Sequence, residues 1–279
     1  RAGVRGEPHL TSSFISTVMC QCPPFQQRIN TNAAPTIITV PMSTLYLVRH
    51  AQASFFEDDY DQLSELGREQ ARHLGAAFAG QSIPFDAVLT GPAKRHRETA
   101  ALTAAAYHNA GLPFPDAEVI EELDEHAADV ILRKSLEEVI GDHDHLQPLA
   151  ENYRGAQDRD DIQKHFQRLF EAVTKLWVAG KIIAPGVEPY AEFHARVCRG
   201  LEEIIADRPS GCRILTFSSV GPMTVILQQS LGLDHEAALQ LGWRLRNCTV
   251  NQFLFSGDRL TLDSFNSVAL LPHDLVTYR

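Results

Sequence analysis

From residue 44 onward the sequence predicts an α/β fold, namely a three-layer α/β/α sandwich around a mostly parallel central sheet. Short apolar runs typical of buried strands alternate along the chain with longer segments of helical periodicity, which is the pattern of that fold class. Apolar residues make up 44% of the 279 residues and charged residues 22%, as in ordinary globular proteins. This length fits one large domain or two small ones.

The expected elements follow one another along the chain. Apolar runs bounded by turn residues predict strands at 44–49, 85–89, 118–122, 213–218, 248–255 and 259–265. Helical periodicity predicts helices at 64–79, 93–109, 190–207, 222–231 and 234–241. The first helix has an apolar stripe formed by Leu66, Gln70, Ala71, Leu74, Ala77 and Phe78.

Two segments lie outside this alternation. Residues 1–41 are rich in Ser, Thr, Pro and Asn, with Glu7 as their one acidic residue, so we expect a disordered extension ahead of a domain at 42–279. Met42 directly precedes the first core strand and offers a natural start. Residues 126–188 form a helical insertion, in which apolar side chains recur at helical spacing at Ile162, Phe166, Leu169, Phe170, Val173 and Trp177. An extra helical layer is its plain role, and a lid is the alternative.

Charge and cysteine content limit the partners. The net charge of −10 makes nucleic acids and anionic membranes poor partners for the surface as a whole. No run approaches the roughly 18 apolar residues of a membrane span. The five cysteines, at 20, 22, 198, 212 and 248, are scattered and show no CxxC spacing, which predicts a reducing, cytoplasmic location. Cys20 and Cys22 lack a second ligand pair, so we expect no bound metal and no cofactor.

The first candidate site lies at the tip of the strand at 44–49. The apolar run ends abruptly in Arg49 and His50. Charged groups are rarely buried unpaired, because removing them from water costs several kcal/mol. Alone, this pair would fit a capped strand end and the start of a loop. Two later segments favour a functional interpretation.

The second segment is Phe85–Ala100, where a short strand turns into a helix. Pro92 suits the first helical position, and Lys94, Arg95 and Arg97 then crowd the first turn. Cations there oppose the helix dipole by about 0.3–1 kcal/mol each when exposed. They are favourable if an anion binds at the helix start, where free N–H groups already attract one.

The third segment is Arg213–Pro222, where a strand runs into small residues and then a helix. Ser218 or Ser219 is a natural N-cap. In open α/β sheets, ligands bind outside the carboxyl ends of the strands. Three strand-to-helix turns, two of them cationic, can therefore converge on one anion.

These segments resemble the motifs of the histidine phosphatase superfamily, the phosphoglycerate mutase-like proteins, over about residues 44–270. Leu47–Ala51 is similar to the family's Arg-His-Gly signature, and Leu63–Ala71 to its Leu-Thr-x-x-Gly-x-x-Gln-Ala helix start. Arg95–Ala100 is similar to Arg-Ala-x-Gln-Thr-Ala, with His96 and Glu98 as substitutions. Leu123-Asp124-Glu125 lies where the family carries a Leu-x-Glu acid.

The resemblance departs from the family at its last motif. The family's Ser-His-Gly-Gly reads Ser218-Ser219-Val220-Gly221 here, so Ser219 replaces the second active-site histidine. A serine hydroxyl keeps at most the hydrogen bond of that histidine. Losing one such donor typically lowers the rate by roughly 10²–10³-fold. The N–H groups of Val220 and Gly221 are expected to recover part of this loss.

The resemblance implies phosphoryl transfer through a phosphohistidine, with His50 as the nucleophile. Arg49 and Arg95 would bind the phosphoryl oxygens and keep His50 neutral. Glu125 would protonate the leaving group, with Glu122 as the second choice. Gln52 would hydrogen-bond the substrate or remain an ordinary loop amide.

Two functions remain open on the sequence alone. The first is a slow, metal-independent phosphatase that acts on a phosphate monoester or a phosphorylated protein. The second is a regulatory module that binds the phosphate but has lost catalysis. A mutase is less favoured, because the four carboxylates in Phe55–Asp61 would repel a second phosphate. The motif comparison also predicts that Ser219→His raises phosphatase activity.

Overall fold

The computed structural model describes residues 42–54, 61–126, 131 and 136–278, and it confirms the α/β sandwich. In this part of the chain six strands form one sheet in the order β3-β2-β4-β1-β5-β6. Their bounds are β1 Ser43–Arg49, β2 Ala87–Thr90, β3 Ala117–Val119, β4 Arg213–Ser218, β5 Val250–Ser256 and β6 Arg259–Ser267. Residues 1–41, for which we predict an extension, and residues 55–60 lie outside the described residues.

Four strands of the sheet are parallel, and a hairpin is added at one edge. β1 pairs in parallel with β4, as does β2 with both β4 and β3, whereas β5 runs antiparallel to β1 and to β6. The carboxyl ends of β1, β2 and β4 therefore lie together at the same end of the strands. An open α/β sheet binds its ligands outside these carboxyl ends.

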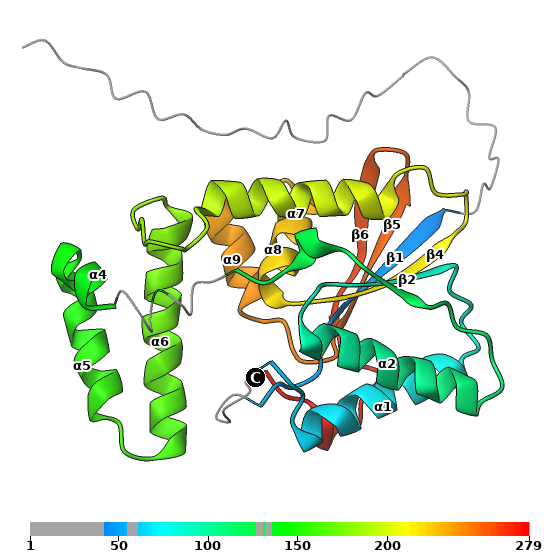
Figure 1. Cartoon of the computed structure of the whole chain (residues 1–279), viewed down its shortest axis with the longest axis horizontal. Coiled ribbons are helices and arrows are strands. Elements are labelled where there is room, and N and C mark those ends of the chain that lie inside the picture. Colours follow the sequence, from blue (N-terminus) through cyan, green and yellow to red (C-terminus); the bar gives the residue numbers. More distant parts are fainter. Residues whose placement is uncertain (1–41, 55–60, 127–130, 132–135, 279) are drawn as a thin grey trace, which may run out of the picture.

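Helices cover both faces of the sheet. α1 (Glu65–Gly80) and α2 (Lys94–Asn109) lie on one face, and α7 (Tyr190–Ile205), α8 (Val220–Leu231) and α9 (His235–Gly242) lie on the other (Figure 1). Side chains of β1 point alternately to the two faces of the sheet, and both faces are apolar. Leu45 and Leu47 pack toward α7 and α8, whereas Val48 packs toward α1 and α2. β1 is therefore a central strand, and whatever follows it is held on a rigid base.

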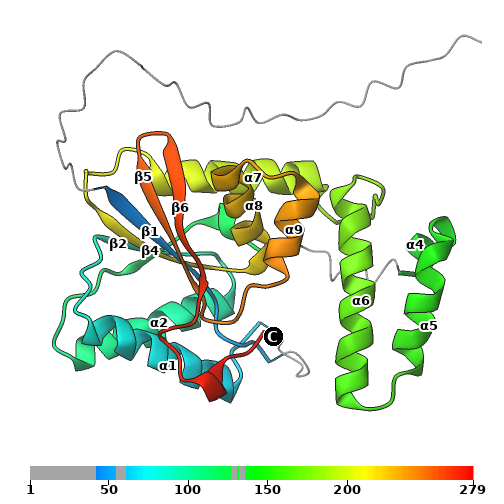
Figure 2. The same ribbon diagram turned by 180° about the vertical axis from the view of Figure 1, so that it is seen from behind.

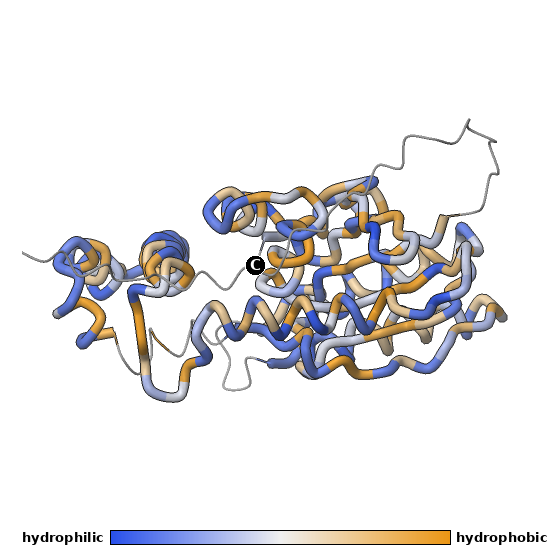
Figure 3. Tube along the Cα trace, turned by 90° about the horizontal axis from the view of Figure 1, so that it is seen from above, coloured by the Kyte–Doolittle hydropathy of each residue, from blue (hydrophilic) through white to orange (hydrophobic). Residues whose placement is uncertain are grey.

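The helical insertion stands beside the sandwich. It contains α4 (Leu136–Asp142), α5 (Gln147–Gly155) and α6 (Arg159–Val178), which lie off the end of the α7 layer in both views (Figures 1 and 2). These helices carry both apolar and polar residues (Figure 3). Leu169, Val173 and Trp177 of α6 are buried and join the core on the α7 side of the sheet. No helix in the described part of the chain is long and apolar enough to cross a membrane.

Several predicted element boundaries were wrong by one to three residues, among them those of β3, α2 and α8. β3 ends at Val119 and not at 122, because its partner strand β2 ends at Thr90, and Glu121–Leu123 form a 3-10 turn (η1) instead. Pro92 precedes α2 by two residues, with Ala93 as the N-cap. α8 begins at Val220, two residues before the predicted start. The last two shifts matter, because both helix starts border the candidate site.

Candidate active site

The carboxyl ends of β1 and β4 are joined directly by their backbones. Arg49 is in register with Ser218, and the N–H of His50 donates to the carbonyl of Ser218 at 2.9 Å. His50 and the turn that begins α8 therefore leave the sheet side by side. This places the first and third sequence segments at one point.

The His50 ring is held as a defined tautomer. Its Nδ1 lies 2.6 Å from the carbonyl oxygen of Ala51, and a carbonyl can only accept, so Nδ1 carries the proton and Nε2 keeps its lone pair. Burial lowers the pKa of His50 well below its usual value, and the charges of Arg95 and Arg49 lower it further. His50 is therefore a neutral imidazole with a nucleophilic nitrogen at neutral pH.

Two motif residues hold the loop that follows His50. The hydroxyl of Thr99 accepts from the N–H of Ala51 at 3.1 Å. The Gln70 side chain accepts from the N–H of Gln52 at 2.8 Å and donates to the carbonyl of Leu275. Gly67 must be glycine, because a Cβ there would collide with the carbonyl oxygen of Gln52. The Leu63–Ala71 and Arg95–Ala100 motifs thus act as supports for the His50 loop.

Gln52 itself is directed toward α1. Its Oε1 accepts from the hydroxyl of Ser64 at 2.9 Å, and Ser64 is the N-cap of α1. This contact matches the loop-amide alternative for Gln52, and a substrate contact remains a prediction.

Arg49 is buried and tied to the end of the chain. Its Nη1 donates to the carbonyls of Leu245 at 2.6 Å and Tyr278 at 2.8 Å. These bonds fix the guanidinium beside His50, where its charge disfavours protonation of the imidazole.

Arg95 projects from the first turn of α2 and is also buried. Its Nη1 pairs with a carboxylate oxygen of Asp61 at 2.6 Å, and its Nη2 donates to the hydroxyl of Ser219 at 3.1 Å. The second carboxylate oxygen of Asp61 accepts from the N–H of Lys94. A carboxylate therefore occupies the anion position that the sequence predicts at this helix start. Sequence reasoning placed Asp61 among repelling charges and missed its pairing with Arg95.

Ser219 occupies the N-cap position of α8, but its side chain makes no hydrogen bond to the first turn of that helix. Instead the hydroxyl contacts Arg95 and, at 2.6 Å, Nε2 of His96. His96 is fully buried, and its ring centre lies 5.5 Å from that of His50. The substitution at position 96 in the motif was the one available signal for this residue.

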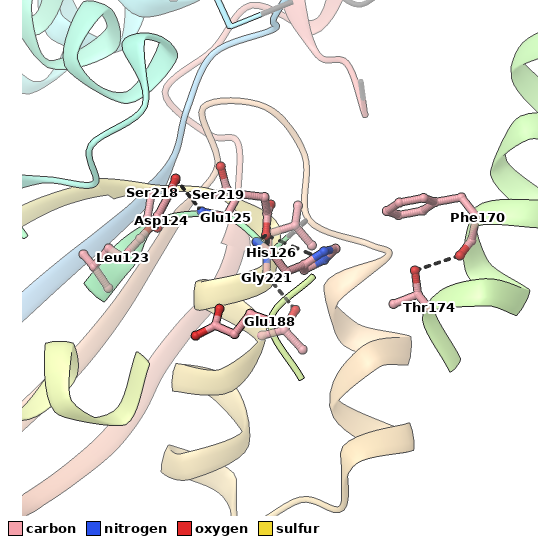
Figure 4. Close-up of polar contacts among 12 residues, drawn as sticks. Leu123, Asp124, Glu125, His126, Phe170, Thr174, Glu188, Ser218, Ser219 and Gly221 are labelled. Atoms are coloured by element: carbon pink, nitrogen blue, oxygen red, sulfur yellow. Dashed lines mark hydrogen bonds and ion pairs between the residues drawn. The ribbon is translucent and has the colours of Figure 1, made fainter. Parts of the chain in front are cut away.

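The acidic loop after η1 lies along the β4–α8 turn (Figure 4). The carboxylate of Glu125 accepts from the N–H of Gly221 at 3.1 Å, so that N–H does not face the phosphate as expected. Desolvation raises the pKa of neighbouring Asp124, which adds a second carboxyl to the candidate acids. Glu122 is displaced from the site, since its Cβ packs against Gly200 of α7. The structure thus brings together His50, Arg49, Arg95, Ser219 and Glu125, with Val220 at the start of α8.

Burial of neutral histidines at this site predicts a stability that depends on pH. The pKa of His50 is lowered in the folded state, so its contribution is present above about pH 6.5 and lost as the pH falls below that value. Each pH unit below it costs up to about 1.4 kcal/mol for such a group. The melting temperature should fall on acidification, and His50→Asn should flatten this dependence. His73→Asn, on the exposed face of α1, is the matched control. An equal slope in wild type and His50→Asn would contradict the assignment.

Comparisons with known proteins give a family match and a set of similar folds. The family model described as the histidine phosphatase superfamily (branch 1) matches residues 45–178 and 149–268. No curated protein sequence matches the chain.

Solved structures with a similar fold include enzymes of more than one activity. An alpha-ribazole phosphatase from Shigella flexneri has 21% identity and a TM-score of 0.53, with 80% of this chain and 96% of that chain covered. A phosphoglycerate mutase from Bacillus anthracis str. Sterne has 19% identity and a TM-score of 0.54, with 83% and 96% covered. A mycobacterial glucosyl-3-phosphoglycerate phosphatase in complex with inorganic phosphate has 20% identity and a TM-score of 0.54, with 82% and 99% covered. At these identities the likeness concerns the fold.

Proposed function

Because the chain belongs to the histidine phosphatase superfamily, we propose that it is a metal-independent phosphomonoester hydrolase that works through a phosphohistidine at His50. The observation that carries this proposal is the 2.6 Å contact of His50 Nδ1 with the carbonyl of Ala51. It leaves the lone pair of Nε2 available for attack on phosphorus.

The reaction would take place in two displacements. Nε2 of His50 forms a bond to phosphorus while the bond from phosphorus to the ester oxygen breaks, and the leaving alkoxide takes a proton from a carboxylic acid. Water then attacks the phosphohistidine, the same carboxylate takes the proton of that water, and the N–P bond breaks to release phosphate. The Nδ1–H bond to Ala51 would stabilise the positive charge that the ring gains in the intermediate. Arg95 and Arg49 would neutralise the phosphoryl oxygens.

Glu125 is the proposed acid, and Asp124 is its competitor. We expect Glu125→Gln to lower kcat about 10²–10⁴-fold for an alkyl phosphate, whose leaving group needs a proton. The loss should be much smaller for a nitrophenyl phosphate, whose leaving group does not. Asp124→Asn is the matched control. If only Asp124→Asn shows this dependence on the leaving group, the acid is Asp124.

A single phosphate monoester, free or on another protein, fits the site better than a bisphosphate. Asp61 already places a carboxylate against Arg95 and would repel a second phosphate. We place the activity in the cytoplasm, since the cysteines of the described residues, Cys198, Cys212 and Cys248, are free thiols and not paired in disulfides.

We expect Asp61→Asn to tighten the binding of inorganic phosphate by a factor of about 3–10. The carboxylate competes with the ligand for the Arg95 guanidinium, and the amide removes that charge. Calorimetric titration with phosphate measures the change, and Glu69→Gln on the exposed side of α1 controls for net charge. Weaker binding in Asp61→Asn would mean that Asp61 orients Arg95.

Turnover of a chromogenic phosphomonoester in excess chelator tests the proposed function. We expect hydrolysis at an unchanged rate when the chelator is added. The alternative, a phosphate-binding regulatory module, is favoured by Ser219 at the position of the family's second histidine. Phosphate binding without any turnover would support that module and reject the hydrolase.

A further inference from the structure

Two departures from the family motifs meet in the structure. Position 96 carries a histidine where the motif has alanine, and position 219 carries a serine where the motif has histidine. The two positions are 123 residues apart in the sequence, yet His96 Nε2 and Ser219 Oγ are 2.6 Å apart. An imidazole lost from the β4–α8 turn is thus matched by an imidazole gained from α2 at the same place.

The backbone leaves room for this imidazole. His96 and Ser219 are both fully buried. The Nδ1 side of the His96 ring faces Gly91, where a Cβ would lie 2.5 Å from Nδ1 and 2.8 Å from the carbonyl oxygen of Leu123. Any side chain at position 91 would displace the ring. Gly91 therefore provides the space that a histidine at position 96 requires.

The hydrogen bonds of Ser219 determine where its hydroxyl proton points. A serine hydroxyl has one proton and two lone pairs, and Arg95 donates to one of those lone pairs at 3.1 Å. When His96 carries a proton on Nε2, it donates to the other. The hydroxyl proton of Ser219 must then point to a third partner. The His50 ring lies 5.5 Å from the His96 ring, so a phosphoryl group under attack by His50 would be that partner.

We propose that His96 supplies, through the Ser219 hydroxyl, the imidazole function that the family motif places at position 219. This inference rests on the proposed hydrolase function. His96 is a positioning residue in this scheme, because Ser219 makes the contact with the phosphoryl oxygen.

The proton movement balances. The transfer starts from the tautomer in which Nε2 of His96 is unprotonated and accepts from the Ser219 hydroxyl. A phosphomonoester monoanion then passes its P–O–H proton to Ser219 Oγ, while the Ser219 hydroxyl proton passes to Nε2 of His96. The products are a bound dianion and an imidazolium that donates back to Ser219. Burial and Arg95 otherwise hold the pKa of His96 well below its usual value. The cation would therefore form only when the anion is present.

Exchanging the two residues tests the inference. Wild type, His96→Ala, Ser219→His and the double variant His96→Ala/Ser219→His are compared in kcat, KM and affinity for inorganic phosphate. We expect His96→Ala to lose about 10²-fold in kcat, with a much smaller change in KM. For Ser219→His alone the motif comparison predicts a gain, but the contacts of Ser219 reverse that expectation. We expect this variant to lose activity, because His96 and Arg95 already fill the space that its ring needs. The double variant should regain a kcat within about tenfold of wild type, since it restores the family arrangement. A double variant no better than the poorer single variant overturns the proposal.

His96→Gln separates this role from simple packing, and it serves if His96→Ala does not fold. Glutamine can keep a hydrogen bond to Ser219 but cannot carry the proton. We expect a melting temperature near wild type with a reduced kcat; full kcat in His96→Gln would overturn the proposal. His108→Ala, exposed on the last turn of α2, is the control.

The affinity for inorganic phosphate tests the role of His96 separately from the proposed hydrolase function. If the wild type binds phosphate but shows no turnover, the hydrolase proposal fails, and the inference is judged on binding alone. Weaker binding in His96→Ala that the double variant restores would then support the exchange, and equal binding in all four proteins would overturn it.

Discussion

Replacing His50 by alanine is expected to abolish phosphatase activity, with kcat falling on the order of 10⁴-fold or more. His50 is the buried neutral imidazole at the tip of β1, and its Nε2 is the proposed nucleophile. No neighbouring group has the same position, because the His96 ring is directed at Ser219. Steady-state kinetics with a chromogenic phosphomonoester measures the loss.

The matched control for this variant is His73→Ala, which removes an exposed imidazole from α1. It should retain wild-type kcat and KM. If His50→Ala keeps activity within about tenfold of wild type while remaining folded, another group attacks phosphorus and the proposed mechanism is wrong.

Replacing Arg95 by alanine is expected to lower kcat/KM by about 10²–10³-fold. Its guanidinium is buried, and it connects Asp61 to Ser219 beside the His50 ring. Removing it takes away the proposed partner of the phosphoryl oxygens and leaves the Asp61 carboxylate without that cation. Arg95→Lys should recover little, because an ammonium cannot bridge both contacts.

Arg97→Ala on the same turn of α2 is the control, since Arg97 is exposed. It changes the net charge equally and should alter kcat/KM less than about threefold. Equal losses in the two variants would indicate that the general positive charge at this helix start, and not the Arg95 contact, binds the anion.

The fold could be predicted from local patterns because apolar residues alternate along the strands and recur every three to four residues along the helices. β1 alternates between two apolar faces, and α1 begins at the Ser64 cap, whose hydroxyl accepts from the N–H of Gly67. The end of β3 could not be predicted this way. Strand length there depends on β2, its partner in the sheet, and pairing partners are distant in sequence.

The site likewise contains residues that the local sequence predicts and contacts that it does not predict. His50, Arg95 and Glu125 lie in motifs whose local sequence carries their identity. The ion pair of Asp61 with Arg95 and the contact of His96 with Ser219 join segments that only the folded chain brings together. The sequence therefore predicts that Ser219 lies where the resembling motif has a histidine, but it does not reveal that His96 contacts Ser219.

Trapping the phosphorylated enzyme during turnover would show whether His50 forms the covalent bond to phosphorus. After a rapid quench of the reaction with a radiolabelled phosphomonoester, we expect a protein-bound label that is labile in acid and stable in base. This label should map to the peptide containing His50 and be absent from His50→Ala. An acid-stable, base-labile label on the peptide containing Ser219 would show that His50 is not the nucleophile, because Oγ of Ser219 would then attack phosphorus.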